Sequence, residues 1–384
     1  MSDEQKAFAV LEVTSQTCTA AINALRNPET TVQLDSDSTA SLETKLRDFQ
    51  SLLSLLYQNT TKLAIALKPS NPTYLAAITP GKDLGFHIDA LTSCICSIDR
   101  NEHGHVLIRE LRKLSEDVVT ALNAVLAVYL SPNNLHQPRD QQTEVREDGK
   151  NEPYLVKTAI VHEAIDLART APRSNHEAIK KCWESVLGGV DDCLKEIQEM
   201  VEDEERGEES DEDSDYQIED SGGWEELGVS DARKESVKAT TEEIIRMKSA
   251  QNLLKFTHTL LKRVPSILLG TSSSSVLITV DNLDKLWSEA SELLKSSDDL
   301  VNALYVPQSD QGLLEQVDAF MSHVNGLQNV LASSQIATLP SKDNDADVAA
   351  SDLSNSSNMQ MFKYRALRKW VLTHLLMCSL ARSA

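Results

Sequence analysis

The sequence is poor in the residues that build β-sheets. Only 4% of its 384 residues are aromatic and only 13 are glycine. No stretch alternates apolar and polar residues over the length of a strand. Strands favour aromatic and β-branched residues, and a stable sheet needs several strands. The one candidate strand, SVLITV at 275–280, has nothing to pair with. These absences exclude a sheet protein and favour an all-α fold.

Long apolar runs and targeting signals are also missing. No window reaches the roughly 18 apolar residues that a membrane-spanning helix needs. The first residues, MSDEQKAFAV, lack the basic and apolar regions of a signal peptide. Six scattered cysteines are typical of reduced, mostly buried thiols in an intracellular protein; they are Cys18, Cys94, Cys96, Cys182, Cys193 and Cys378. We therefore expect no transmembrane segment and residence in the cytoplasm, the nucleus or both.

Metal-binding motifs are incomplete. The segment HEAID at 162–166 is half of the zinc-protease pattern HExxH, but Asp166 stands where the second histidine belongs. We interpret it as one face of a surface helix. His103 and His105 have few potential ligands nearby, and they are typical of a loop that leads into a helix. The sequence predicts no metal site.

Other catalytic signatures are missing as well. Cys94 and Cys96 lie in an apolar helical segment, which predicts core positions. The segment PGKDLG at 80–85 has neither the spacing nor the hydroxyl residue of a phosphate-binding loop. No nucleophile and base can be paired from their spacing. We therefore predict no catalytic or cofactor-binding residues and no enzymatic activity.

One segment has a high density of negative charge. Residues 199–220 contain thirteen carboxylates and one basic residue, Arg206, in a chain whose net charge is −22. Such a segment buries too little apolar surface to offset the entropy cost of ordering, and its charges repel one another. We predict a disordered acidic linker. The acidic balance disfavours nucleic acid and favours basic protein partners or basic segments of this chain.

Elsewhere apolar residues recur every three or four positions, which is the pattern of amphipathic helices. Ser174 and Glu177 have the spacing of a capping box. All eleven prolines are expected between helices, because proline breaks helix interiors. The periodic segments are 38–67, 105–130, 174 into the acidic segment, 231–263, 281–305 and 312–332. The pattern predicts long amphipathic helices in one or two bundles, interrupted by the acidic linker.

These patterns divide the chain into four parts. We predict an N-terminal helical bundle over 1–200, an acidic flexible linker over 201–229, C-terminal helices that complete a bundle over 230–335, and a polar, disordered tail over 336–384. The tail ends in a basic amphipathic segment. That segment has three interpretations, namely a membrane-surface helix, an intramolecular partner for the acidic run, or an extension without a specified role.

One helix carries a heptad-like seam. Leu46, Leu53, Thr60 and Leu67 follow one another at intervals of seven, so this stripe is suited to pairing with a partner helix. Helices inside a folded bundle show the same stripe. Additional apolar residues on other faces of this helix favour the bundle.

The acidic run has two interpretations. It is either a solvated spacer between helical parts or a docking strip for a basic protein segment. Ser210 precedes three acidic residues, which is the context of acid-directed kinases of the casein-kinase-two type, and phosphorylation there would add nearly two negative charges. The docking strip comprises Glu202, Asp203, Glu204, Glu205, Asp211, Glu212 and Asp213.

Four segments, in this order, carry a family resemblance. They are LRDFQSLLSLLYQNTTKLAIAL, HEAIKKCWESVLGGVDDCLKEIQEMVEDEE, EEIIRMKSAQNLLKFTHTLLKR and VDNLDKLWSEASELLKSSDDLVNALYVPQ. Over roughly residues 38–335 the chain resembles the GCIP family, the Grap- and cyclin-D-interacting proteins, also called cyclin-D-binding or HHM-like proteins. The tail from about 340 has no counterpart in that family.

The resemblance implies an all-helical adaptor without enzymatic activity. Animal members are described as binding D-type cyclins, a Grap-type adaptor and helix–loop–helix transcription factors, as negative regulators in cytoplasm and nucleus. The chain has no basic region ahead of a helix pair, which agrees with binding proteins rather than DNA. No motif defines the residues that contact a partner, so none is carried over. The alternatives are a cytoskeletal scaffold of the vinculin or catenin kind and an acidic histone chaperone.

Overall fold

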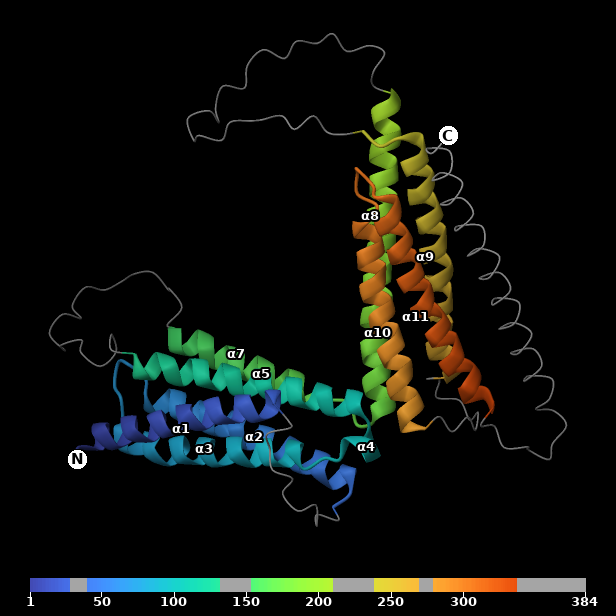
Figure 1. Ribbon diagram of the computed structural model, residues 1–384. Coiled ribbons are helices and arrows are strands. Elements are labelled where there is room, and N and C mark those ends of the chain that lie inside the picture. Colours follow the sequence, from blue (N-terminus) through green and yellow to red (C-terminus); the bar gives the residue numbers. More distant parts are fainter. Residues whose placement is uncertain (28–39, 132–152, 210–237, 269–278, 337–384) are drawn as a thin grey trace, which may run out of the picture. The chain divides into compact units, whose positions relative to one another are not determined.

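The fold is entirely helical in the part of the chain that the computed structural model describes, which is residues 1–27, 40–131, 153–209, 238–268 and 279–336 (Figure 1). No strand occurs among these residues. The all-α prediction is therefore confirmed. The chain divides into two compact units, the first ending at Ile179 and the second beginning at Lys180. No helix of the described part is long and apolar enough to cross a membrane.

The described residues of unit 1 form a ring of five long helices. Helix α1 packs against α3 and α5, α2 packs against α3 and α7, and α5 packs against α7, which closes the ring. The short helix α4 precedes α5 (Figure 1). The bounds are α1 Asp3–Arg26, α2 Leu42–Ala66, α3 Tyr74–Cys96, α4 Arg100–His103, α5 His105–Leu130 and α7 Pro153–Arg169.

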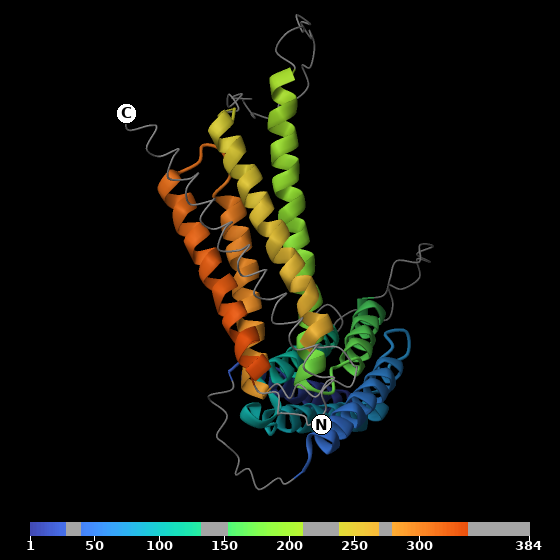
Figure 2. The same ribbon diagram turned by 90° about the vertical axis from the view of Figure 1, so that its right-hand side faces the viewer.

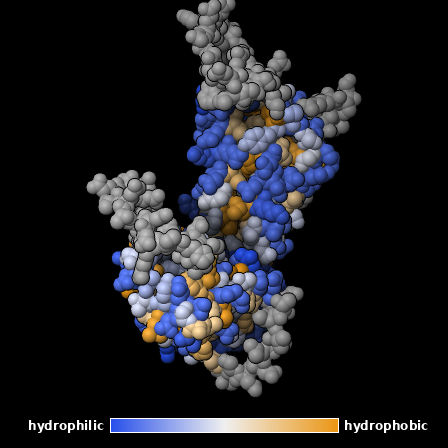
Figure 3. Space-filling view, turned by 90° about the vertical axis from the view of Figure 1, so that its left-hand side faces the viewer, coloured by the Kyte–Doolittle hydropathy of each residue, from blue (hydrophilic) through white to orange (hydrophobic). Residues whose placement is uncertain are grey.

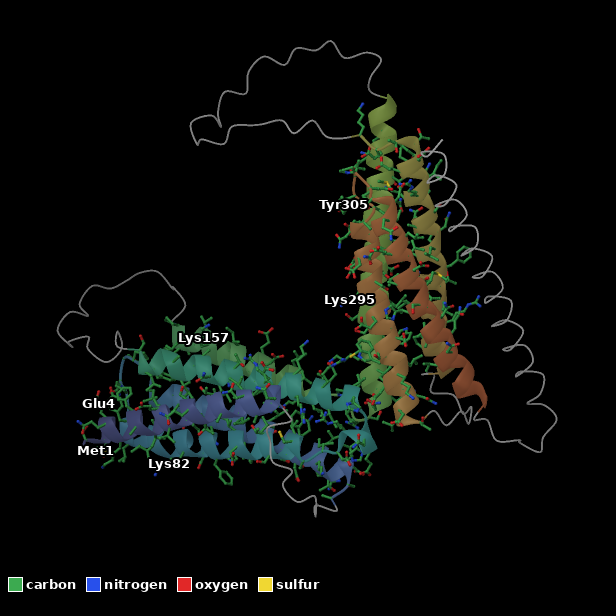
Figure 4. All side chains as sticks on the ribbon, in the orientation of Figure 1. Met1, Glu4, Lys82, Lys157, Lys295 and Tyr305 are labelled. Atoms are coloured by element: carbon green, nitrogen blue, oxygen red, sulfur yellow. The ribbon has the colours of Figure 1, made fainter. Side chains whose placement is uncertain are left out.

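In unit 2 the described ranges form four long helices, and these run side by side in both ribbon views (Figures 1 and 2). Their bounds are α8 Asn175–Glu209, α9 Thr241–Leu268, α10 Val280–Asn302 and α11 Asp310–Ile336. Gly189 lets α8 and α10 approach closely, because a Cβ there would lie 2.6 Å from Leu294 Cδ1. After α10, Tyr305 donates a hydrogen bond to Glu196 of α8 at 2.6 Å (Figure 4).

The apolar stripes expected from the sequence face the cores. Phe49, Leu53, Leu56 and Leu63 of α2 are at most 1% exposed, as are Leu254 and Leu261 of α9. The heptad-like seam of α2 therefore lies inside unit 1, because Leu53 and Thr60 are buried there. The same burial holds for the expected stripe positions of α10, namely Leu283, Leu286, Ala290, Leu293, Leu300 and, just beyond the helix, Leu304.

A side chain from a distant helix caps α5. Its first residue follows Gly104, which has a φ of 96° and no capping side chain. The Oδ1 atom of Asn175 accepts a hydrogen bond from the backbone N–H of Leu107 at 3.0 Å, so it occupies the role of an N-cap. Any Cβ at position 104 would collide with Asn175. Position 104 therefore requires glycine for two reasons, namely the positive φ of the backbone and the lack of room for a Cβ atom.

The expectation that every proline lies between helices is wrong at two positions. Pro80 lies inside α3 and Pro265 lies inside α9. A proline in a helix leaves the carbonyl four residues earlier without its donor. For Pro265 that carbonyl belongs to Leu261, and the indole N–H of Trp183 donates to it at 3.0 Å. The partner is 78 residues away in the sequence, so the local pattern could not reveal it.

The acidic linker begins later than the sequence suggested. Residues 201–209 were assigned to it, but they form the last turns of α8. Ion pairs one helical turn apart support these turns, namely Lys195–Glu199 and Glu202–Arg206. Residues 210–229 and the tail over 337–384 lie outside the described residues, as does most of SVLITV, of which Thr279 caps α10.

The unit boundary also differs from the predicted one. The N-terminal bundle was expected to extend to residue 200, but unit 1 ends at Ile179. From Trp183 onward, α8 forms hydrogen bonds with other segments of unit 2, namely Trp183 with Leu261 of α9, Cys193 Sγ with Asp298 of α10 at 3.0 Å, and Glu196 with Tyr305. Most of α8 therefore belongs to the second bundle.

We predict that replacing Trp183 with Phe destabilises the protein by about 1–3 kcal/mol, because the Leu261 carbonyl loses the hydrogen bond from the indole. In a Pro265→Ala background the alanine N–H can bind this carbonyl, so the same replacement should cost about 1 kcal/mol less. Urea unfolding followed by circular dichroism measures both costs. The cavity left by the smaller ring is common to both backgrounds, so equal costs would contradict the role of the hydrogen bond.

Candidate protein-interaction surfaces

Four of the seven residues of the acidic docking strip are described, and they lie on the last turns of α8. There, Glu202 accepts a hydrogen bond from Gln198 at 2.8 Å and pairs with Arg206, which also pairs with Asp203 at 3.5 Å. The outer carboxylates nevertheless remain open to solvent, with side-chain exposures of 48% for Glu202 and 73% for Asp203. These two residues are accessible to a basic partner.

The other two strip residues of α8 hold α9. Glu204 accepts a hydrogen bond from the backbone N–H of Ala239 at 3.0 Å, just before α9 begins. Glu205 pairs with Lys248 of α9 at 2.6 Å. These contacts give part of the strip a structural role, which the sequence did not indicate. Ser210, Asp211, Glu212 and Asp213 lie outside the described residues, so their roles stay predictions.

A buried polar cluster beside this strip was missed by the sequence analysis. Thr240 and Glu243 form a capping box at the start of α9. The Glu243 carboxylate accepts a hydrogen bond from the backbone N–H of Thr240 at 2.8 Å, and the Thr240 hydroxyl accepts one from the backbone N–H of Glu243 at 3.3 Å. The other carboxylate oxygen of Glu243 accepts the backbone N–H of Gln308 at 2.9 Å. The spacing Thr-x-x-Glu was a usable signal for the cap. The contact with Gln308 had no local signal.

The cluster joins α9 to the connection between α10 and α11. The amide of Gln308 donates to the carbonyls of Glu243 and Leu304, and Arg246 pairs with Asp310 at 2.7 Å. Glu243 and Arg246 are 6% and 4% exposed. Burial alone would raise the pKa of Glu243, but the hydrogen bonds from Thr240 and Gln308 and the charge of Arg246 outweigh it and lower that pKa. The ionised carboxylate is therefore the form that fits.

We predict that Glu243→Gln lowers the free energy of unfolding by about 1–3 kcal/mol at pH 7. A lowered folded-state pKa adds stability that is complete above the ordinary value of 4.5 and is lost as the pH falls through the folded-state pKa. The difference between wild type and variant should therefore shrink between pH 6 and pH 3.5, as measured by urea unfolding. Glu184→Gln, on an exposed part of α8, is the matched control. A difference independent of pH would contradict the assignment.

A shallow groove runs along the outer face of α2 and α3 in unit 1. Leu52 and Leu55 of α2 and Ala90 of α3 supply its apolar surface, while Ser51, Ser93 and Ser97 supply hydroxyl groups. Asp48 and Lys45 line it as well. The ammonium group of Lys45 donates to the carbonyl of Ser97 at 2.7 Å, which leaves Asp48 as the exposed charge of the groove.

The thiol in this groove is held in its protonated form. Cys94 donates to the Lys45 carbonyl at 3.4 Å. Burial, followed by the charge of Asp48, raises the pKa of Cys94 to about 11. A thiol in this state is a poor nucleophile at neutral pH. Cys94 and Cys96, expected in the core, are only half-buried.

The histidines noted in the sequence lie at packing positions. The ring of His162 stacks on that of Tyr57 with centroids 3.8 Å apart, and its Nε2 atom is 3.2 Å from Thr61 Oγ1. His162 is therefore half-buried against α2 rather than fully on the surface. His103 is the last residue of α4 and His105 is the first residue of α5, so both are helical, and only Gly104 lies between the two helices where a longer loop was expected. Among the described residues, no three His, Cys, Asp or Glu side chains are grouped as a metal site would require.

The surfaces of both units combine hydrophobic and hydrophilic areas. In one view, hydrophobic patches alternate with hydrophilic regions on each unit (Figure 3). Exposed large apolar side chains include Leu55 and Ile65 of α2 and Phe86 of α3. The fold and these surfaces define an all-α protein whose candidate sites are helix faces and grooves.

Comparison with known proteins places this protein in a family. The family model described as Grap2 and cyclin-D-interacting, N-terminal, matches residues 48–203, and the model described as Grap2 and cyclin-D-interacting, C-terminal, matches residues 207–329. The chain belongs to this Grap2 and cyclin-D-interacting family, and the resemblance noted from the sequence is confirmed. The two matches meet near the end of α8 rather than at the boundary between the compact units.

A fission yeast protein is also similar. An uncharacterized protein of Schizosaccharomyces pombe is 23% identical over 300 residues, which cover 76% of this chain and 80% of the relative. Its name assigns no activity.

Proposed function

We propose that this protein is a non-enzymatic adaptor that regulates cell-cycle progression or transcription by binding cyclin-like, helix–loop–helix or adaptor proteins in the cytoplasm and nucleus. Family membership supports protein binding, because the family is described by its interaction with Grap2 and cyclin D. The action is stoichiometric. A bound partner loses access to its other ligands for as long as the complex lasts.

The groove between α2 and α3 is the observation that carries this proposal. It offers an apolar strip flanked by hydroxyl groups and one exposed carboxylate, Asp48. An amphipathic helix binds such a groove with its apolar face, and a basic residue beside that face would pair with the carboxylate. Most of the groove, from Asp48 to Ser97, lies within the region that the N-terminal family model matches.

The acidic strip adds electrostatic attraction. Exposed carboxylates at Glu202 and Asp203, continued by the acidic residues that follow α8, attract basic segments and raise association rates. In this proposal the groove supplies specificity, because its contacts depend on shape. The strip supplies encounter rate, because its attraction depends on charge alone.

We expect Leu55→Asp to weaken recovery of partners about tenfold or more, because a carboxylate would replace apolar contact in the groove. The control is Ile65→Asp, on the same helix but outside the groove, where the side chain is already 72% exposed. Tagged full-length proteins are recovered from cells and their partners quantified by mass spectrometry. Equal loss with both variants, or recovery of actin or histones in place of regulatory proteins, would overturn the proposal.

The role of the acidic strip in partner association must be tested with a variant that leaves the helical bundle intact. Deleting residues 199–226 would remove Glu204 and Glu205, which hold α9. Replacing Asp211, Glu212 and Asp213 with their amides avoids this. We expect slower partner association and a weaker salt dependence, measured by surface plasmon resonance on a recovered partner. Amides at Glu4, Glu12 and Glu163 give the same charge change on unit 1, and an equal effect there would show that only net charge matters.

A further inference from the structure

One helix of this acidic protein has basic residues but no acidic ones over most of its length. Asp and Glu make up 59 of the 384 residues, yet none occurs between Glu243 and Asp281. Within that interval lies most of α9. Lys248, Lys255 and Lys262 follow one another at intervals of seven, so they lie on one stripe of the helix.

This stripe faces solvent. Lys248, Lys255 and Lys262 are exposed, and the exposed Arg263 adjoins them. Two large apolar side chains lie on the same side of α9, namely Ile245 at 42% and Phe256 at 44% exposure. We define the basic face of α9 as these six residues. It combines positive charge with accessible apolar surface.

Two lysines of this face differ in their contacts within the bundle. Lys248 pairs with Glu205 of α8 at 2.6 Å. Lys255, two turns further along, donates instead to the neutral side chain of Gln251 at 2.9 Å. Positive charge therefore persists along the face beyond the first pair.

We propose that the basic face of α9 binds the chain's own acidic segment, residues 210–226. Charge complementarity is the first argument, because this segment contains eight carboxylates and no Lys or Arg. It also contains Tyr216, Ile218 and Trp224, which are suited to cover the apolar surface at Ile245 and Phe256. The segment thus has both kinds of group that the face requires.

The points of attachment are the second argument. The segment follows Glu209 at the end of α8, and the chain returns at Lys238 before α9. Glu204 accepts a hydrogen bond from the backbone of Ala239, and Glu205 pairs with Lys248. Both attachment points of the segment therefore lie near the Lys248 end of the basic face. From Lys248 to Lys262 the helix rises about 21 Å. The intervening residues 210–237 can extend about 3.3 Å each, which is enough to pass along the face and return.

Tethering favours this occupant over other polyanions. A net charge of −22 repels nucleic acid and anionic membranes at a distance. A tethered segment is attached at both ends close to the start of α9, so it does not have to cross the screened distance that an outside polyanion must cross. Its effective concentration is on the order of millimolar. A phosphate on Ser210 would strengthen the contact, and a basic partner would compete with α9 for the segment.

Zero-length carbodiimide cross-linking of the unmodified full-length protein, followed by mass spectrometry, tests this contact. We expect cross-links from Lys255 or Lys262 to carboxylates within 211–226, and we expect 1 M NaCl to reduce them severalfold. The Lys248–Glu205 pair, at 2.6 Å, is the internal positive control. If that cross-link forms and neither Lys255 nor Lys262 reacts with the segment, the proposal is wrong.

Two controls make the outcome specific. Lys295 is an exposed lysine of α10 outside the basic face (Figure 4), and equal cross-linking of Lys295 to the segment would overturn the proposal. Replacing Asp211, Glu212, Asp213 and Asp215 with amides should reduce cross-links from Lys255 and Lys262 to the four remaining carboxylates, which are Glu219, Asp220, Glu225 and Glu226. Mixing isotope-labelled and unlabelled protein detects contacts between copies, and predominance of mixed pairs would assign the face to a second molecule instead.

Discussion

The hydrogen bond from the Trp183 indole to the Leu261 carbonyl is the constraint on which the second bundle depends. Pro265 removes the backbone donor that this carbonyl would otherwise have, and a buried carbonyl without a donor is costly. The indole is completely buried and points at that one oxygen. It therefore allows α9 to continue beyond the proline, and it fixes the position of α9 along α8.

A second set of contacts acts at the other end of the same helix pair. Trp183 lies near the start of α8 and Leu261 near the end of α9, whereas Glu204 and Glu205 lie near the end of α8 and bind the start of α9. The pair is antiparallel and is fixed at both ends. Two of the carboxylates in these acidic turns, Glu204 and Glu205, have partners at the start of α9, which supports the helix in a strongly acidic part of the sequence.

The fold class was predictable because apolar periodicity is local. Leu254 and Leu261 of α9 were expected on one stripe, and both are buried. The failures came from contacts between residues far apart in the sequence. The Trp183 indole supplies the hydrogen bond that Pro265 cannot donate, and the Glu243 carboxylate accepts a hydrogen bond from Gln308, 65 residues away. The α2–α3 groove was equally unpredictable, because it depends on which faces remain uncovered after packing.

Charge in this protein is organised by helix rather than spread evenly. The last turns of α8 are acidic, whereas α9 has no carboxylate after Glu243. At the physiological Debye length of about 8 Å, a partner responds to such local groups more than to the total charge. The net charge alone would therefore not reveal the basic face of α9. An acidic protein can carry a cationic face, and the antiparallel pairing of α8 and α9 places the Lys248 end of that face beside the end of α8.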